Sequence, residues 1–308
     1  MKKNIRMLLS ILLAVIFLGS TGMVLRQSIH YKNGDQAYHD AEKLSGISQA
    51  DQTNASSDIA EAIASETIKN TMQVVEESVG DDLQTVSEQV QPEEPVPQVW
   101  IPEPVTQDAY VESLQETDLE ALREVNPDVI GWIMIPDTVI NYPLLQGEDN
   151  QYYLDYTWDL QRNAVGSIFL ECTNNSDLTD FHTIIYGHNM KAKTMFSAIR
   201  SYKSKEFQAA HPYVYIVSDA GVYRYEVYAS YEADVTSYTY RLGFSTDEDK
   251  QDFIELGVEQ SVIDTGIVPE ITDRILTLST CTGNGHATRW VVHARLKMIT
   301  ENLQEGDK

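Results

Sequence analysis

The sequence predicts a mostly β domain whose strands form a closed or nearly closed barrel. Between residues 129 and 299 lie eight short runs rich in Val, Ile, Tyr and Phe, separated by Gly, Pro, Asn and Asp. Few helical patterns interrupt these runs, and many short strands with few helices favour a barrel. The longest run also alternates cleanly, which indicates an antiparallel sheet with one buried face. The residues on that face are Tyr223, Tyr225, Val227 and Ala229.

The predicted strands are bounded by turn-forming residues. In chain order they are VIGWIMIP (129–136), VINYPLL (139–145), GSIFLE (166–171), HTIIYGH (182–188), PYVYIVS (212–218), VYRYEVYASYEA (222–233), RILTLSTC (274–281) and RWVVHARLKMI (289–299). Each run is short and rich in β-branched or aromatic residues, as strands of a small barrel are.

Three helices are predicted in the same region. The first covers Asp118–Asn126 and is stopped by Pro127. Its apolar face holds Leu119, Leu122 and Val125. The other two cover Thr194–Gln208 and Asp247–Ile263. Acidic residues such as Asp247 and Asp249 at the start of a helix suit the helix dipole, so we do not interpret them as a calcium site.

The charge of the chain is acidic and unevenly distributed. Its 308 residues hold 47 Asp and Glu against 22 Lys and Arg, a formal net charge of −25. This balance argues against a nucleic-acid binder, which needs a basic surface to displace counterions. Residues 1–31 hold four basic residues and no acid, whereas residues 32–120 hold 20 acids and three bases. We therefore expect a membrane-directed end (1–31), an acidic stalk (32–117) and a folded domain (118–308).

The segment Met7–Leu25 carries no charge over 19 residues, which is almost enough for a helix to cross a bilayer. Lys2, Lys3 and Arg6 precede it, so the positive-inside rule places the N-terminus in the cytoplasm and the rest of the chain outside. We expect an uncleaved signal anchor and a single-pass membrane protein with an extracellular catalytic domain. A cleaved signal peptide is the alternative, although no clear A-x-A site follows the apolar core.

Residues 32–117 have the composition of a flexible stalk. They are acidic and poor in aromatic residues, and 91–104 holds five of the ten prolines of the chain. Such segments favour disorder or extended polyproline II structure. The stalk is expected to act as a tether or as a generic solvated linker.

Cys281 is the most distinctive candidate for chemistry. It ends the run RILTLSTC, and a small polar loop follows it. A thiol in this position is exposed enough to react, but it needs a nearby cationic group to ionise near neutral pH. His188 also ends a predicted strand, and Arg289 begins the next strand after Cys281. A hairpin would bring Arg289 back beside Cys281, so all three side chains are expected at one rim of the barrel.

These motifs resemble those of the sortases, cysteine transpeptidases of Gram-positive cell envelopes. The resemblance rests on TLSTC (277–281) followed by Arg289, with YGHN (186–189) upstream, and covers residues from about 118 to 300. NPDVIGWIMIPDTVINYPLLQGEDNQYYL (126–154), GSIFLE (166–171) and TIIYGHNM (183–190) resemble class B in type and order. Class B implies a closed eight-stranded barrel with an N-terminal helix and a long helix between strands 6 and 7, which the pattern at Asp247–Ile263 fits.

The resemblance also implies roles for individual residues. Cys281 matches the nucleophile, His188 the general acid or base, and Arg289 the residue that positions the substrate carbonyl or its oxyanion. Four further positions match substrate contacts: Asn150, Leu154, Tyr186 and Ser279. The implied partners are the sorting peptide of a secreted protein and an amine acceptor, either a peptidoglycan precursor or a pilin Lys. No cofactor is implied, and no CxxC or HxxxH spacing suggests a metal site.

The remaining Cys and His residues are expected to be inactive. Cys172 is interpreted as a spare thiol, His182 as a surface residue, His293 as a strand residue and His286 as a loop residue. Two other functions use the same sequence features. An exported cysteine hydrolase would release its product to water, and a non-catalytic envelope-binding barrel would not need Cys281, His188 and Arg289 together.

Overall fold

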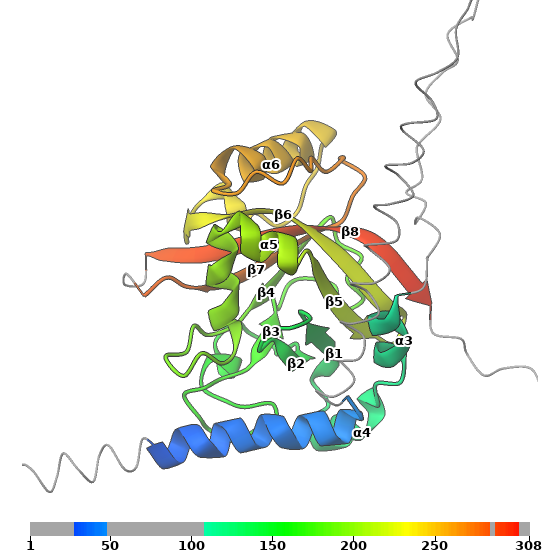
Figure 1. Cartoon of the computed structure of the whole chain (residues 1–308), viewed down its shortest axis with the longest axis vertical. Coiled ribbons are helices and arrows are strands. Elements are labelled where there is room, and N and C mark those ends of the chain that lie inside the picture. Colours follow the sequence, from blue (N-terminus) through cyan, green and yellow to red (C-terminus); the bar gives the residue numbers. More distant parts are fainter. Residues whose placement is uncertain (1–27, 48–107, 284–286, 302–308) are drawn as a thin grey trace, which may run out of the picture.

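The strands form a closed β-barrel with helices on its outer surface (Figure 1). This computed structural model describes residues 28–47, 108–283 and 287–301. Eight strands pair in the order β1-β2-β3-β4-β7-β8-β6-β5, and β5 pairs with β1 to close the barrel. All eight predicted strands are confirmed. Their bounds are Val129–Met134 (β1), Asn141–Leu145 (β2), Ile168–Leu170 (β3), His182–Tyr186 (β4), Tyr213–Ser218 (β5), Gly221–Asp234 (β6), Ile275–Cys281 (β7) and Thr288–Glu301 (β8).

The barrel is mixed rather than antiparallel throughout. β2 pairs with β3 and β4 pairs with β7 in parallel, while the other six pairs are antiparallel. The prediction of an antiparallel sheet is therefore wrong for two pairs. Parallel strands place their carboxyl ends at the same edge. The ends of β4 and β7 consequently lie side by side at one rim.

Strand β6 is buried on both faces over much of its length. Tyr225 and Val227 pack in the main core of the barrel, whereas Tyr228 and Ala229 pack against Phe253 of α6. A register shift between Val227 and Ala229 moves successive side chains onto different faces. The expected single buried face therefore ends at this bulge, and a helix covers the outer face beyond it.

The helices surround the barrel without entering it. Their bounds are Ala109–Gln115 (α3), Leu119–Val125 (α4), Tyr152–Leu154 (η1), Phe196–Lys203 (η2), Lys205–Ala210 (α5), Tyr238–Tyr240 (η3) and Asp247–Gln260 (α6), where η marks 3₁₀ helices. The predicted helix before β1 is confirmed as α4, although Val125 is 42% exposed rather than part of the buried face. The long helix expected between strands 6 and 7 is α6.

The second predicted helix is divided in two. Ser204 has an extended backbone, with φ −103° and ψ 131°, and separates η2 from α5. Its side chain accepts a hydrogen bond from the backbone N–H of Phe207 and so caps α5. A capping serine therefore divides a pattern that reads as one continuous helix.

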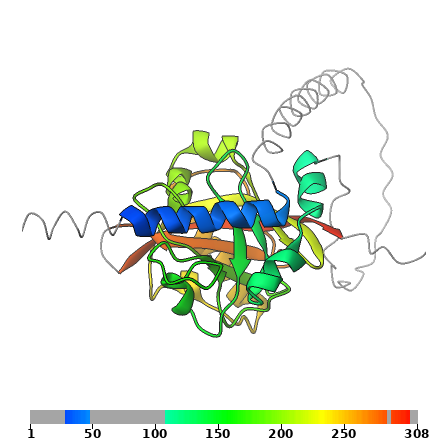
Figure 2. The ribbon, with the colours of Figure 1, turned by 90° about the horizontal axis from the view of Figure 1, so that it is seen from below.

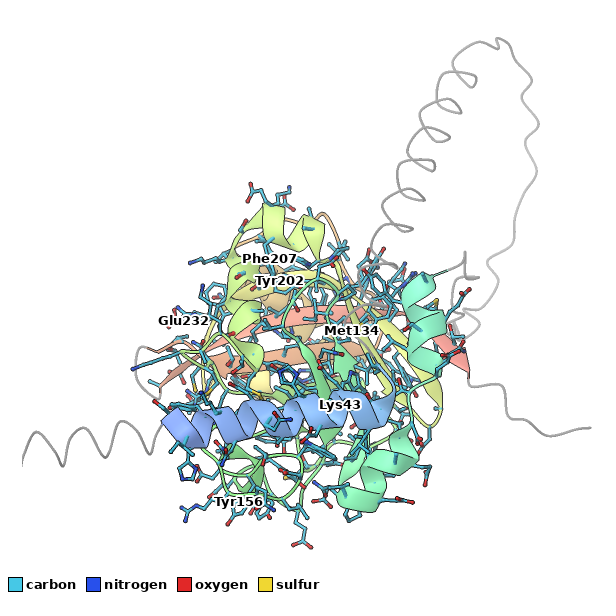
Figure 3. All side chains as sticks on the ribbon, turned by 60° about the horizontal axis from the view of Figure 1, so that its bottom comes forward. Lys43, Met134, Tyr156, Tyr202, Phe207 and Glu232 are labelled. Carbon is cyan, nitrogen blue, oxygen red and sulfur yellow. The ribbon has the colours of Figure 1, made fainter. Side chains whose placement is uncertain are left out.

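A helix upstream of residue 108 packs along the barrel (Figure 2). We call it the N-terminal helix, and its described part is 28–45. Its buried face repeats every three or four residues and is built mainly from small side chains: Gly34, Ala37, Tyr38, Ala41 and Ser45. A β-carbon at Gly34 would lie 2.9 Å from Val165, so the two segments pack without room for a larger residue. Lys43, labelled in Figure 3, lies on the exposed side of the helix.

Hydrogen bonds fix this helix to the barrel domain. The indole N–H of Trp158 donates to the carbonyl of Ala37 at 2.7 Å, and the amide of Asn163 donates to the carbonyl of His30 at 2.7 Å. The N–H of Asp118 donates to the carbonyl of Ser45 at 3.0 Å. The N-terminal helix and α4 are thus in direct contact.

The prediction of a stalk over residues 32–117 is wrong at both ends. Residues 32–45 belong to the docked N-terminal helix, and α3 follows residue 108. Residues 48–107 lie outside the described part of the chain, as does the predicted anchor Met7–Leu25. In residues 28–47, 108–283 and 287–301, no helix combines the length and apolar composition needed to cross a bilayer.

A chain of hydrogen bonds joins two buried histidines across four strands. His182 is 2% exposed, which shows that its expected surface position is wrong. Its Nδ1 donates to the carbonyl of Arg241 at 2.8 Å, and its Nε2 is 2.7 Å from the hydroxyl of Thr277. That hydroxyl lies 2.9 Å from Nδ1 of His293, whose Nε2 lies 2.9 Å from the Tyr231 hydroxyl. Donors and acceptors match with both imidazoles neutral.

We expect stability to fall as the pH drops below about 6.5. Burial lowers the pKa of His182 to about 4 and lowers the pKa of His293 well below its usual value. The unfolded chain then binds protons that the folded state excludes, so acid favours unfolding by about 1 kcal/mol per histidine for each pH unit. Urea unfolding between pH 7.5 and 5.0 would measure this slope. His293→Gln should make the free energy of unfolding less dependent on pH. The control His39→Gln, on the exposed side of the N-terminal helix, should leave this dependence unchanged. Equal slopes in the unmodified protein and both variants would contradict a role for buried His293.

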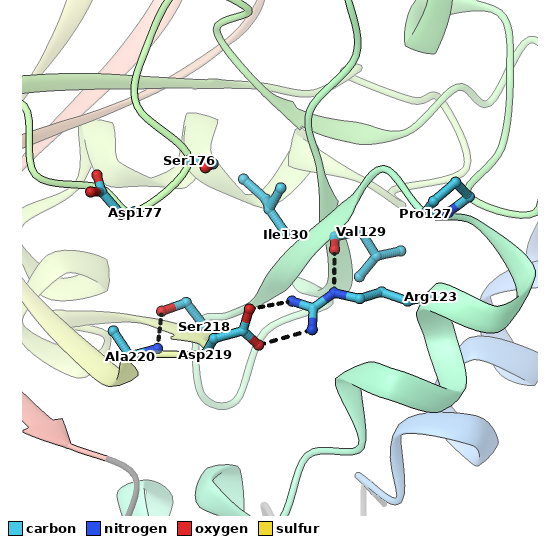
Figure 4. Close-up of a pocket in the computed structure, with 9 residues that line it drawn as sticks. All are labelled: Arg123, Pro127, Val129, Ile130, Ser176, Asp177, Ser218, Asp219 and Ala220. Atoms are coloured by element: carbon cyan, nitrogen blue, oxygen red, sulfur yellow. Dashed lines mark hydrogen bonds and ion pairs between the residues drawn. The ribbon is translucent and has the colours of Figure 1, made fainter.

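A pocket of about 360 Å³ lies near the β5–β6 turn, at the end of β8 opposite Arg289. Arg123 crosses it and forms a bidentate ion pair with Asp219, at 2.9 and 3.0 Å (Figure 4). The Nε of Arg123 also donates to the carbonyl of Val129 at 2.9 Å. These contacts connect α4 to β1 and to the β5–β6 turn, which is a structural role for the arginine.

Candidate active site

The rim formed by the ends of β4 and β7 holds the predicted catalytic residues. Tyr186 is aligned with Ser279 in the parallel β4–β7 pair. Three hydrogen bonds continue this alignment past the end of β4. They join the N–H of Gly187 to the Ser279 carbonyl (3.2 Å), the Thr280 hydroxyl to the Gly187 carbonyl (2.6 Å) and the Asn189 amide to the Cys281 carbonyl (2.8 Å). His188 is therefore held at the level of Cys281.

Gly187 allows the chain to turn at this point. A β-carbon there would lie 2.4 Å from Ile168 and 2.7 Å from the ring of Phe196. No larger residue fits without displacing these core side chains. The sequence YGHN thus places the imidazole at the rim because the preceding residue has no side chain.

Arg289 is the direct cross-strand partner of Cys281. The antiparallel β7–β8 pair runs from Ile275↔Arg295 to Cys281↔Arg289. The hydroxyls of Thr282 and Thr288 are 3.0 Å apart and continue the contact between the two strands just beyond this pair. The structure confirms the expectation that β7 and β8 place Arg289 beside Cys281.

The imidazole of His188 is oriented by the backbone. Its Nε2 donates to the carbonyl of Leu154 at 2.7 Å. Nδ1 is therefore the ring nitrogen available to the Cys281 thiol, which lies within hydrogen-bonding reach. Both side chains are partly buried.

The three groups perturb one another electrostatically. The hydrogen bond from His188 lowers the pKa of Cys281 although burial opposes it, and the charge of Arg289 lowers it further. The same hydrogen bond raises the pKa of His188 against the effect of burial, and the Leu154 carbonyl adds to the rise. A cysteine and a histidine shifted in these directions form a thiolate–imidazolium pair more readily.

Comparison with known proteins identifies the family of the chain. A family model described as Sortase domain matches residues 133–297. Sortase B of Listeria monocytogenes is 39% identical over 164 residues, which are 53% of this chain and 67% of that protein.

The chain belongs to the sortase family. The match to sortase B makes it a class B sortase and therefore a cysteine transpeptidase. A solved Staphylococcus aureus sortase B–substrate complex matches with a TM-score of 0.56 and 32% identity, over 59% of this chain and 85% of that one. A structure of sortase B complexed with triglycine matches with the same TM-score and identity, over 59% and 86%.

Two of the predicted substrate-contact residues of this sortase meet at the carboxylate of Glu171. Asn150 donates to it at 2.7 Å and the hydroxyl of Tyr186 at 2.8 Å. Burial would raise the pKa of Glu171, but these hydrogen bonds outweigh it and lower the pKa. The other end of the Asn150 amide accepts the N–H of Cys172 at 2.8 Å. Asn150 and Tyr186 are thus fixed in place by Glu171, the last residue of GSIFLE, to which the sequence analysis assigns no role.

The other two predicted contacts are placed differently. Leu154 is 38% exposed and orients His188 through its backbone carbonyl rather than its side chain. Ser279 is only 2% exposed, and its hydroxyl lies 2.9 Å from that of Tyr240. Tyr240, in η3, is close enough to Cys281 and Arg289 to interact with both electrostatically. No local motif marks Tyr240, because η3 reaches the site only through tertiary packing.

The remaining candidates of the sortase lie away from this rim or outside the described residues. His293 is fully buried within β8, as expected for a strand residue, and His286 is outside the described part of the chain. The two cysteines are both free thiols. The described residues contain no group of three or more His, Cys, Asp or Glu arranged to hold a metal ion.

The two thiols of this sortase should react differently with alkylating agents. Burial and the neighbouring Glu171 raise the pKa of Cys172, whereas His188 and Arg289 lower that of Cys281. Iodoacetamide at pH 6–7 should therefore modify Cys281 first, because the thiolate is the reactive form. His188→Ala should move the alkylation profile of Cys281 to higher pH. Peptide mapping by mass spectrometry would follow both sites, and faster labelling of Cys172 would contradict the assignment.

Proposed function

We propose that this sortase cleaves a C-terminal sorting motif at a Thr residue and transfers the product to an amine. Cys281 acts as nucleophile, His188 as general acid and base, and Arg289 as the donor to the oxyanion. The observation that carries the proposal is the β4–β7–β8 alignment, which brings these three side chains to one rim. The lowered pKa of Cys281 supports its role as the attacking group.

In the first half of the reaction, the thiolate of Cys281 attacks the carbonyl carbon of the Thr residue. A C–S bond forms and the carbonyl oxygen becomes an oxyanion, to which the Arg289 guanidinium donates hydrogen bonds. When the intermediate collapses, the C–N bond breaks and the imidazolium of His188 gives its proton to the leaving amine. The product is a thioacyl enzyme with a neutral His188.

In the second half, an incoming amine attacks the thioester carbon. His188 accepts a proton from this amine as the new C–N bond forms. The intermediate collapses by breaking the C–S bond, which restores the thiolate and the imidazolium. The bond formed is an amide like the one broken, so the cycle needs neither a cofactor nor a redox partner.

The partners that we propose are the sorting peptide of a secreted protein and an amine acceptor. Related sortase B structures bind a substrate and triglycine, which supports a peptide groove and an acceptor site beside the rim. A peptidoglycan precursor and a pilin Lys both offer a suitable amine, and the proposal includes either.

We further propose that Met7–Leu25 anchors the enzyme and that the catalytic domain faces outward. The basic residues before this segment and its uncharged length support this orientation. The full-length protein should fractionate with membranes and retain its N-terminus. Recovery from the medium of a form that starts near residue 23–30 would instead indicate cleavage.

The proposed reaction is tested by incubating the full-length protein in detergent with a peptide library and candidate amines. Mass spectrometry should identify a thioacyl adduct on Cys281 and an amide product that contains the added amine. The amine distinguishes transpeptidation from hydrolysis: a product that contains water whether or not an amine is present would indicate a cysteine hydrolase. No adduct with any peptide would argue for a binding barrel.

A further inference from the structure

The N-terminal helix contacts the backbone that supports the active site. Its Tyr38 is 7% exposed, and the hydroxyl donates a hydrogen bond to the carbonyl of Gly166 and lies 3.2 Å from the hydroxyl of Ser167. Burial raises the pKa of this phenol, so the hydroxyl stays protonated at neutral pH and can donate. The contact joins segments 128 residues apart in the sequence.

Gly166 lies directly against the ring of His188. Its φ is +61°, and a β-carbon there would be 2.8 Å from Cδ2 of His188. It would also be 2.7 Å from the carbonyl oxygens of Tyr153 and Leu154. Because the Leu154 carbonyl is the acceptor for Nε2 of His188, the Gly166 backbone packs against both the ring and its hydrogen-bond partner. A displacement of Gly166 therefore moves the imidazole.

A second tyrosine supports the segment that follows His188. The rings of Tyr38 and Tyr142 pack edge to face, with centroids 5.1 Å apart. The hydroxyl of Tyr142 accepts the N–H of Met195 at 3.0 Å. The next residue, Phe196, donates its N–H to the carbonyl of His188 at 2.9 Å. Tyr38 thus supports the His188 ring through Gly166, and Tyr142 supports the loop that follows His188 through Met195.

We propose that Tyr38 and Tyr142 are positioning residues for His188, and that the N-terminal helix is consequently required for full catalytic rate. The inference rests on the proposed role of His188 as acid and base. Neither tyrosine contacts the reacting atoms. They act by fixing the Gly166 backbone and the Met195 loop, so that Nδ1 of His188 faces the Cys281 thiol while Nε2 stays bonded to Leu154.

The test compares Tyr38→Phe and Tyr142→Phe with the unmodified full-length protein in detergent. Each substitution removes one hydroxyl and keeps the ring. We expect kcat for thioacyl formation to fall roughly tenfold with KM nearly unchanged, because small misplacements of a catalytic group are costly. The pH profile for iodoacetamide alkylation of Cys281 should shift to higher pH in the same variants, which a purely structural role would not produce.

The matched control is Glu42→Ala on the same helix. It removes the hydrogen bond from the Asn141 amide, at 3.1 Å, and touches neither Gly166 nor Met195. The control should keep the wild-type kcat and alkylation profile. If it loses as much rate as Tyr38→Phe, general docking of the helix and not the tyrosine is responsible, and the proposal is wrong.

His188→Ala separates the failure of this inference from failure of the proposed function. An active His188→Ala would overturn the proposed function itself. An inactive His188→Ala together with unchanged Tyr38→Phe and Tyr142→Phe would overturn only the positioning role. Thermal unfolding shows whether each variant is folded; if Tyr38→Phe is not, Tyr142→Phe decides, and a wild-type rate and profile there contradicts the proposal.

Discussion

Cys281→Ala should abolish formation of the thioacyl intermediate. The methyl group that remains cannot form a C–S bond, and the described rim offers no second thiol beside His188 and Arg289. Removing a nucleophile of this kind lowers the rate by many orders of magnitude. Intact-protein mass spectrometry after incubation with a sorting peptide should show no adduct, while the circular dichroism spectrum stays that of the unmodified protein.

Cys172→Ala is the matched control, because it removes the other thiol of the chain. Cys172 donates its backbone N–H to Asn150, and a change of side chain preserves this hydrogen bond. The variant should form the adduct at close to the wild-type rate. If the adduct is instead found on Cys172, the assignment of the nucleophile is wrong.

Arg289→Ala should lower kcat/KM by about 10²–10³, the usual effect of losing one oxyanion donor. Arg289→Lys should recover little of this rate, since an ammonium keeps the charge but not the planar fork of N–H donors. Arg289 is paired with Cys281 across the strands, so the loss of its charge should also raise the pKa of the thiol. Pre-steady-state rates of thioacyl formation and the alkylation profile of Cys281 would measure both effects.

The control is Arg200→Ala, which removes an exposed cation in η2. It tests whether any loss of positive charge from this acidic protein lowers the rate. A near-wild-type rate for Arg289→Lys would mean that charge alone suffices, and the proposed donor geometry would be wrong.

The positions of Cys281 and Arg289 were predictable because the signals that place them are local. The run that ends at Cys281 and the run that begins at Arg289 are neighbours in sequence, and a hairpin necessarily returns one beside the other. His188 needed a family resemblance, since the parallel β4–β7 pairing joins residues about 90 positions apart, and no periodicity encodes it. Periodicity identified the strands themselves, because short β-branched runs between turn residues have few other interpretations.

The parts that the sequence did not reveal depend on contacts between distant segments. Glu171 and Tyr240 join the site through tertiary packing. Glu171 ends the run GSIFLE, which by itself does not show its partners, and Tyr240 belongs to no recognisable motif. His182 reads as a surface residue because only the fold shows Thr277 and Arg241 as its partners. The N-terminal helix was missed for another reason. Its buried face is made largely of Gly, Ala and Ser, so it packs closely while contributing little to apolar content.

The docked N-terminal helix determines whether the length of the acidic segment 48–107 can set the distance between the membrane and the domain. This segment of 60 residues leaves the domain near Ser45 and returns to it before Asp118, and those two residues are themselves hydrogen-bonded at 3.0 Å. The segment therefore connects two neighbouring points of the same domain, and its length does not set the distance between that domain and residue 28. Only residues 26 and 27 separate the proposed anchor from the described part of the N-terminal helix. If that anchor is in the bilayer, as proposed, the described domain begins only a few residues from the membrane surface.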